Sequence, residues 1–268
     1  DHGTHVAGII CGGATAESKA LGIANGLVDI IPVRMVPDGD EMDKDVANAI
    51  RYAVDQGASI INMSFGKYVS PNPQRVREAL RYAAAHDVLI VHAAGNEARD
   101  IDAWPFYPNP GRYRDVDSIF INVGASTSSY DDLLIADFSN FGKRRVDLFA
   151  PGEDILSLGA DHDYIEYSGT SMASPIVAGL AALLRAYFPD FTAAEIKDII
   201  LDSVHKPDFR MFSPGASPSE VTFTKTMSKF CKSGGIVNAR NAVLEAQKQR
   251  SAKEAATLAA ADFEAAAA

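Results

Sequence analysis

Residues 59–93 read SIINMSFGKYVSPNPQRVREALRYAAAHDVLIVHA, and this stretch decides the fold class. It contains two apolar runs, 59–64 and 88–93, that have the length of buried strands. Between them, residues 73–86 show the apolar spacing of a helix, and Pro73 suits its first turn. A strand, a helix and a second strand in this order form a β-α-β unit with parallel strands.

The same alternation extends in both directions from this unit. On the N-terminal side, residues 29–36 are interpreted as a buried strand and residues 43–56 as a helix with one apolar face. We therefore predict an α/β fold with a mostly parallel sheet. The elements expected after residue 93 are a strand at 119–123, loops and hairpins over 126–169, a buried helix at 171–187, and a helix at 192–203 that starts with a capping-box-like pair, Thr192 and Glu195.

The last part of the chain departs from this alternation. Residues 206–233 are rich in Ser, Pro, Lys and Phe without clear periodicity, and we interpret them as a long loop or an insertion. A last amphipathic helix is expected at 236–249. The Ala-rich segment 250–268 has few large apolar residues to anchor it. We predict one domain over residues 1–249, followed by a tail that is a linker or a frayed helix.

The composition excludes two classes of partner. The chain has 268 residues, 47% of them hydrophobic, which is enough for the core of a single domain. Its formal net charge of −10 provides no basic stripe, so we expect no nucleic acid. Its apolar stretches are far shorter than the ~20 residues that span a bilayer, so we expect no membrane span. Two cysteines, Cys11 and Cys231, neither require nor exclude a disulfide.

The chain opens with a histidine pair framed by glycine, Asp1-His2-Gly3-Thr4-His5, directly ahead of a small-residue helix pattern. On the loop side of that helix, the His2 imidazole would face a cleft as a general base. Two other interpretations stay open: His2 is an ordinary capping or surface residue, or it binds a metal together with Asp1 and His5. No further ligand cluster with matching spacing follows, which disfavours the metal site.

Two further segments carry residues suited to acyl transfer. Asn96 ends the turn after an apolar strand, and its side-chain amide can donate to an oxygen that becomes negative. Ser171 lies in the motif SGTSMASP at 168–175, where free N–H groups and the helix dipole favour an oxyanion. Taken singly, Asn96 is better explained as a turn residue that tolerates a positive φ. Ser171 taken singly is an ordinary N-cap, a role that Ser168 or Thr170 could fill instead.

Together and in this order, the three segments resemble the histidine, oxyanion-asparagine and serine blocks of the subtilisin-like (subtilase, S8) serine peptidases. The stretches INMSFG at 61–66, FSNFG at 138–142 and VDLFAPG at 146–152 are also similar to that family. The resemblance covers residues 1–203 and resumes at 234–242. It implies a three-layer α/β/α fold whose N-terminal part is missing from these residues.

The resemblance also implies a mechanism. Ser171 would attack a peptide carbonyl, His2 would act as general base, Asn96 would donate to the oxyanion, and water would hydrolyse the acyl-enzyme. His5 would then be structural. No cofactor is required in this mechanism. Relatives often bind structural calcium, but no Asp-rich loop here has a clear calcium spacing, so no metal ligand is assigned.

The same resemblance implies where a polypeptide substrate binds. The substrate strand would pair with the edge at Ser64, Phe65 and Gly66, and the primary specificity pocket would be walled there and by Ala94 and Gly95. Glu97 at the pocket rim could favour a basic or polar side chain, although exposed turn acids are usually just solvated. By the family's habit, we expect a secreted or cell-envelope protein whose precursor includes a propeptide.

The triad aspartate departs from the family pattern. In the family it lies on a strand upstream of the histidine block, and we expect it upstream of residue 1, since Asp1 is adjacent to His2 and its side chain diverges. Loss of this group lowers kcat by roughly 10⁴-fold in such proteases, subtilisin among them. The isolated chain should therefore be nearly inactive. We also expect it to fold poorly, because the missing segment would supply a central strand whose absence exposes apolar sheet positions and unpaired backbone groups. A pseudoprotease or peptide-binding module is the alternative, disfavoured because His2, Asn96 and Ser171 are intact.

Overall fold

The computed structural model describes residues 1–13, 18–36, 39, 41–111, 113–160, 163–216 and 224–267, without the side chains of 262–267. Among these residues, four parallel strands form one sheet in chain order. This confirms the predicted α/β fold with a parallel sheet. The strands are β1 (Ile60–Met63), β2 (Leu89–Ala93), β3 (Phe120–Ser126) and β4 (Leu148–Pro151).

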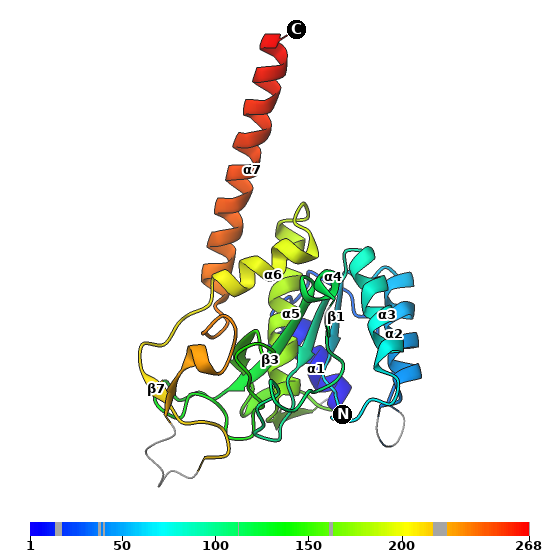
Figure 1. Cartoon of the computed structure of the whole chain (residues 1–268), viewed down its shortest axis with the longest axis vertical. Coiled ribbons are helices and arrows are strands. Elements are labelled where there is room, and N and C mark those ends of the chain that lie inside the picture. The colour runs from blue at the N-terminus through cyan, green and yellow to red at the C-terminus, as the bar shows by residue number, and fades with distance from the viewer. Residues whose placement is uncertain are drawn as a thin grey trace.

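Helices lie on both sides of the sheet, as Figure 1 shows. On one side, α2 (Asp43–Asp55) packs against α3 (Pro73–Ala85), and α3 contacts β2. On the other side, α5 (Thr170–Tyr187) crosses the sheet and contacts all four strands, while α1 (His2–Cys11) packs against α5. The predicted helices at 43–56, 73–86 and 171–187 differ from the observed ones by a single residue each.

The helix starts follow from their capping residues. In α3, the Asn72 side chain accepts a hydrogen bond from the Arg75 N–H, and Pro73 occupies the first helical position, where a missing N–H costs nothing. Helix α6 (Ala193–Asp202) begins with a reciprocal capping box between Thr192 and Glu195, as predicted. A short helix, α4 (Arg114–Asp117), leads into β3.

The core is continuous under the two central strands. Every residue of β2 and β3 is buried, because helices cover both faces of a parallel sheet. The Lys197 ammonium is also buried there, 3.3 Å from Asp147 Oδ1, and it donates to the carbonyl oxygens of Asp117 and Phe120. These partners satisfy a charge that would be costly to bury alone.

The predicted strand at 29–36 is wrong. This segment has no strand structure, and Ile30, Ile31 and Val33 are exposed. The physical reason is that a strand needs a hydrogen-bonded neighbour, and none of the described residues pairs with this segment. Among the described residues, strand β1 pairs with β2 alone, so its other edge has no strand partner in this part of the chain.

The region after the sheet contains the expected hairpin, and segment 206–233 is more ordered than the sequence indicates. Strands β5 (Ile155–Leu158) and β6 (Tyr164–Tyr167) pair antiparallel. Within 206–233, the described residues form a two-residue ribbon and a 3-10 turn, and Met211, Met227, Phe230 and Cys231 are buried in a second apolar cluster with Ala94 and Phe106. The ribbon and turn are β7 (Arg210–Met211), β8 (Lys225–Thr226) and η2 (Met227–Lys229).

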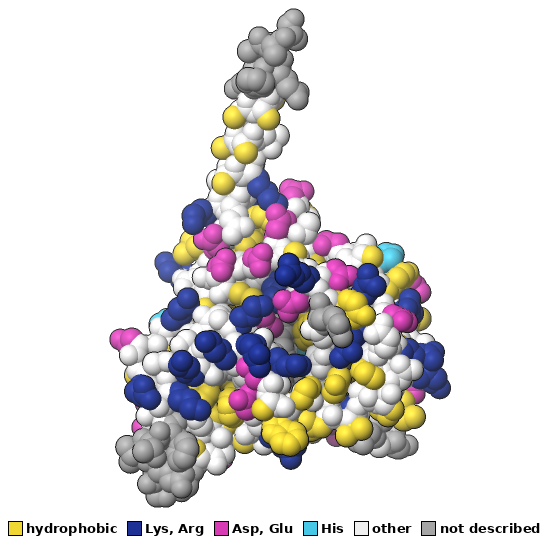
Figure 2. Space-filling view, viewed as in Figure 1, with side chains coloured by type: hydrophobic (Ala, Val, Ile, Leu, Met, Phe, Trp, Pro, Cys, Tyr) yellow, Lys and Arg dark blue, Asp and Glu magenta, His cyan; other side chains and the backbone are white. Residues whose placement is uncertain are grey.

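The last helix, α7 (Ala239–Ala267), starts later than predicted and includes the Ala-rich tail. Its first half is anchored, since Arg250 lies over the ring of Phe188 and Lys253 over that of Phe191. Its second half projects away from the domain (Figure 1), and apolar side chains line it in Figure 2. No helix in the described part of the chain is long and apolar enough to cross a membrane. Cys11 and Cys231 are both free thiols.

Candidate active site

Ser171 lies in the first turn of α5, as the sequence predicts. The backbone N–H groups of this turn have no acceptor inside the helix, and the positive end of the helix dipole lies there. The Ser171 hydroxyl donates to the carbonyl oxygen of Ser64 over 3.2 Å, and the Ser64 hydroxyl donates to the Ser171 carbonyl oxygen over 2.8 Å. This exchange joins the start of α5 to the segment that follows β1.

Asn96 is oriented by Thr170, the first residue of α5. The Asn96 side-chain oxygen accepts hydrogen bonds from the Thr170 N–H, at 2.8 Å, and from the Thr170 hydroxyl, at 2.9 Å. The Gly95 N–H donates to the same hydroxyl oxygen. Because the amide oxygen is engaged in this way, the Asn96 NH₂ group is left to donate elsewhere.

The Asn96 amide and the Ser171 N–H converge beside Gly169. A Cβ atom built on Gly169 would lie 3.5 Å from Asn96 Nδ2 and 3.6 Å from the Ser171 nitrogen. Two N–H donors this close to one point can stabilise a negative charge that develops there. Helix α5 thus supplies one donor and, through Thr170, orients the other.

The segment of Ser64, Phe65 and Gly66 leaves the backbone groups of Gly66 unpaired among the described residues. Gly66 makes no backbone hydrogen bond within the described part of the chain, whereas its neighbour Lys67 exchanges two with Tyr107. A free N–H and C=O in an extended segment can pair with a further strand. The segment lies beside Ser171, as the hydrogen bonds from Ser64 show.

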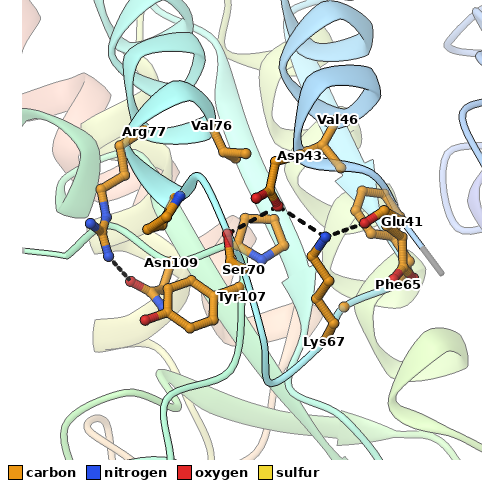
Figure 3. Close-up of a pocket in the computed structure, with 13 residues that line it drawn as sticks. Glu41, Asp43, Val46, Phe65, Lys67, Ser70, Val76, Arg77, Tyr107 and Asn109 are labelled. Carbon is orange, nitrogen blue, oxygen red and sulfur yellow. Dashed lines mark hydrogen bonds and ion pairs between the residues drawn. The ribbon is translucent and has the colours of Figure 1, made fainter.

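A pocket borders the same segment on its far side (Figure 3), between Lys67 and the start of α2. The Lys67 ammonium lies 2.9 Å from Asp43 Oδ1 and also donates to the Glu41 carbonyl oxygen. Burial would raise the pKa of Asp43, but hydrogen bonds from the Asn72 N–H, Lys67 and the Ser70 hydroxyl outweigh it and lower this pKa. The ion pair fixes the chain direction just after Gly66.

His2 is the first residue of α1, and its side chain is exposed. Desolvation by its neighbours, and then the charge of His5, lowers the pKa of His2 below its usual value. No hydrogen bond or ion pair joins the His2 ring to another described residue, and the Ser171 hydroxyl donates to Ser64 instead. Thus α1 and α5 pack together, but the predicted base and nucleophile are not hydrogen-bonded.

His5 faces the other way. Its ring is fully buried, with Nε2 at 3.0 Å from the carbonyl oxygens of Ile155 and Ile165, and it packs against Tyr167. This position agrees with a structural role and removes His5 from any shared site with Asp1 and His2. Within the described ranges, no group of three or more His, Cys, Asp or Glu side chains is placed to hold a metal.

A hydrogen-bonded network supports the turn that carries Asn96. The buried Asn140 side chain donates to the Ala94 carbonyl oxygen and to Glu97, and it accepts from the backbone N–H groups of Glu97 and Arg99. Tyr68 donates to the Glu97 carboxylate over 2.8 Å. Burial and this hydrogen bond to Glu97 raise the pKa of Tyr68.

His92, in β2, contacts the segment of Ser64, Phe65 and Gly66. Its Nε2 lies 2.9 Å from the Phe65 carbonyl oxygen and its Nδ1 lies 3.1 Å from the Asn122 side-chain oxygen. Burial lowers the pKa of His92 to about 4, although both acceptors favour the charged ring. A neutral ring has one N–H and donates to one of the two acceptors.

Sequence reasoning missed the residues that hold the predicted ones in place. The sequence indicates Thr170 only as a helix cap, while Asn140 and Phe106 carry no local signal that relates them to Asn96 or Gly66. The motif at 138–142 contains Asn140 and resembles a family block. The five hydrogen bonds of the Asn140 side chain, however, join it to segments that are far away in the sequence.

Comparison with known proteins identifies the family. The subtilase family profile matches residues 1–241. A thermophilic serine proteinase of Bacillus sp. (strain AK1) is 42% identical over 69% of this chain and 43% of its own length. A cell wall-associated protease of Bacillus subtilis (strain 168) is 36% identical over 80% of this chain and 22% of its own length. The chain thus spans less than half the length of these two relatives.

The solved structures agree with the fold. The crystal structure of a cold adapted subtilisin-like serine proteinase is 30% identical, with a TM-score of 0.64, covering 86% of this chain and 73% of that chain. Curated relatives include cell wall-associated, extracellular and intracellular serine proteases. Both the fold and the sequence relatives therefore relate this chain to serine proteases.

Proposed function

The chain belongs to the subtilase family, and on this premise we propose that it is the catalytic core of a serine endopeptidase. Ser171 Oγ attacks a peptide carbonyl, His2 takes the Ser171 proton and later gives it to the leaving amine. Asn96 Nδ2 and the Ser171 N–H stabilise the oxyanion. Water then hydrolyses the acyl-enzyme.

One observation carries this proposal: the Asn96 amide nitrogen and the Ser171 backbone nitrogen both lie beside Gly169. If Ser171 were only a helix cap, the Asn96 amide would not be needed beside it. Yet Thr170 orients this amide through two hydrogen bonds to its oxygen, at 2.8 and 2.9 Å. An ordinary turn asparagine does not need this orientation. Acyl transfer needs both donors, because negative charge develops on one oxygen.

The test is labelling of the full-length protein with a fluorophosphonate probe, which reacts with activated serine hydroxyls. Wild type should be labelled and Ser171→Ala should not. Ser168→Ala is the matched control, since Ser168 is exposed, lies three residues away and donates to Asp154. Equal labelling of Ser171→Ala and wild type would refute the assignment of the nucleophile. No labelling of a folded protein would favour a peptide-binding pseudoprotease.

The triad also needs a carboxylate that fixes the His2 ring, and from the order of the family's sequence blocks we propose that it lies upstream of His2. None of the described carboxylates makes an ion pair or hydrogen bond with His2, and Asp1 is its sequence neighbour. We expect the isolated chain to turn over peptides about 10⁴-fold more slowly than the full-length protein. Full activity of a folded 268-residue chain would overturn this.

We further propose that catalysis needs no cofactor, that polypeptides are the substrates, and that the protein works in the cell envelope or outside the cell. Support for the location is the name of the cell wall-associated relative. Activity that survives a chelator but not a serine-directed phosphonate would remove the metal-hydrolase alternative. Cell fractionation tests the location, and recovery in the cytosol would contradict it.

A further inference from the structure

The ring of Phe106 lies between the two segments that we expect to wall the primary specificity pocket. A Cβ atom built on Gly66 would lie 2.3 Å from one ring carbon and 2.6 Å from the next. A Cβ atom built on Gly95 would lie 3.0 Å from the same outer ring carbon. Both contacts are closer than real Cβ atoms allow or tolerate easily, so the ring fills the space between the two glycines.

The Phe106 ring is held in this position. It is 6% exposed and packs edge-on against Tyr68, with ring centroids 5.0 Å apart. The Phe106 carbonyl oxygen accepts from the buried Asn109 side chain over 2.7 Å. The next residue, Tyr107, exchanges two backbone hydrogen bonds with Lys67. Backbone and ring are thus fixed from several sides, and a long substrate side chain could not easily displace them.

The acid at the pocket rim is already engaged. One Glu97 carboxylate oxygen accepts hydrogen bonds from its neighbour's N–H (Asn96, 3.0 Å), from Tyr68 (2.8 Å) and from Asn140 (2.9 Å). A carboxylate with three donors is stabilised where it lies. These hydrogen bonds hold the Glu97 carboxylate at the rim, and its second oxygen has no partner among the described residues.

From these contacts we infer that the primary pocket is shallow, with Phe106 as its floor, and that it selects a small side chain on the residue whose carbonyl is attacked. The substrate class is peptides with Gly, Ala or Ser at that position. Larger aromatic, aliphatic and basic side chains collide with the ring, as in proteases whose small pocket restricts them to small residues. The inference rests on the proposed peptidase function.

The test uses the full-length protein and peptides that differ only at the residue before the cleaved bond: Ala, Leu, Phe or Lys. Wild type should cleave after Ala with a kcat/KM at least about tenfold above that for Leu, Phe or Lys. Phe106→Gly should raise the ratio of kcat/KM for Phe to that for Ala by about 100-fold or more, because removal of the ring deepens the pocket. Phe106→Leu should give an intermediate ratio.

The outcomes separate this inference from the proposed function. Equal wild-type cleavage after Phe and Ala, or an unaltered ratio in an active Phe106→Gly variant, would overturn the shallow pocket and leave the peptidase assignment standing. Absence of all cleavage, together with no labelling of Ser171 in the folded protein, would overturn both. Circular dichroism melting checks that each variant is folded, and labelling of Ser171 in Phe106→Gly checks the reaction centre.

Discussion

The serine and histidine sides of the candidate active site differ in how firmly they are held. On the serine side, Thr170 orients Asn96, and Ser64 and Ser171 exchange hydrogen bonds. On the histidine side, the exposed His2 ring makes no hydrogen bond to another described residue. The proposed oxyanion donors are therefore held by contacts between the sheet and α5, whereas the ring of the proposed base has no such contact among the described residues.

The largest expected effect concerns His2. In the full-length protein, His2→Ala should lower kcat by about 10⁶-fold, because base and nucleophile act as a unit. In the isolated 268-residue chain the same change should cost only about 10²-fold, because the unfixed ring has already lost most of its contribution. Rates of peptide cleavage or of probe labelling measure both. An equal loss in the two proteins would mean that His2 needs no outside group.

Asn96→Leu should lower kcat by about 10² to 10³-fold with little change in KM, since its amide acts on charge that exists only in the transition state. The loss should be similar in the full-length protein and in the isolated chain, because α5 organises this side by itself. Steady-state kinetics and labelling rates provide the comparison. A loss confined to the full-length protein would contradict the independence of the serine side.

The pH dependence of the free energy of unfolding should depend on His92, which lies behind the serine side. Burial lowers the pKa of His92 to about 4 in the folded protein, below its ordinary value of 6.5. Between these values the unfolded chain binds more protons, so the free energy of unfolding falls as pH drops from 6.5 to 4, by on the order of 3 kcal/mol. Denaturant titration at several pH values measures this, and His92→Gln should flatten the dependence. An equally steep dependence in His92→Gln would assign it to other groups.

The smallest expected effect concerns Thr170. Thr170→Val removes the hydroxyl that donates to Asn96 but keeps the backbone N–H that also donates. Removing one of the two hydrogen bonds should lower kcat by roughly tenfold at unchanged pH optimum. Thr170→Ser keeps the hydroxyl and should restore most of the rate. If Thr170→Ser is as impaired as Thr170→Val, the methyl group's packing is responsible and not the hydrogen bond.

The sequence predicts those parts of the fold and of the candidate site that depend on residues close together in the chain. The β-α-β stretch at 59–93 predicts its elements well because apolar periodicity and Pro73 act within a few residues. The prediction of a strand at 29–36 was wrong because an apolar run forms a strand only beside a hydrogen-bonded partner strand. The spacing of apolar residues does not show whether such a partner exists. For the site, His2, Asn96 and Ser171 stand in short motifs, whereas the roles of Thr170 and Phe106 depend on contacts between distant segments.

The second apolar cluster has a consequence for the exchange of parts between relatives. It places Ala94 and Phe106 in one packed unit with Met227, Phe230 and Cys231 of the 206–233 segment. Consider a chimaera that receives only the segments around Gly66 and Gly95 and the Phe106 ring between them. In it, Phe106 would pack against side chains of the recipient that do not match it. To transfer the cleavage preference to a relative, the segments around Gly66, Gly95 and Phe106 should therefore be exchanged together with residues 206–233.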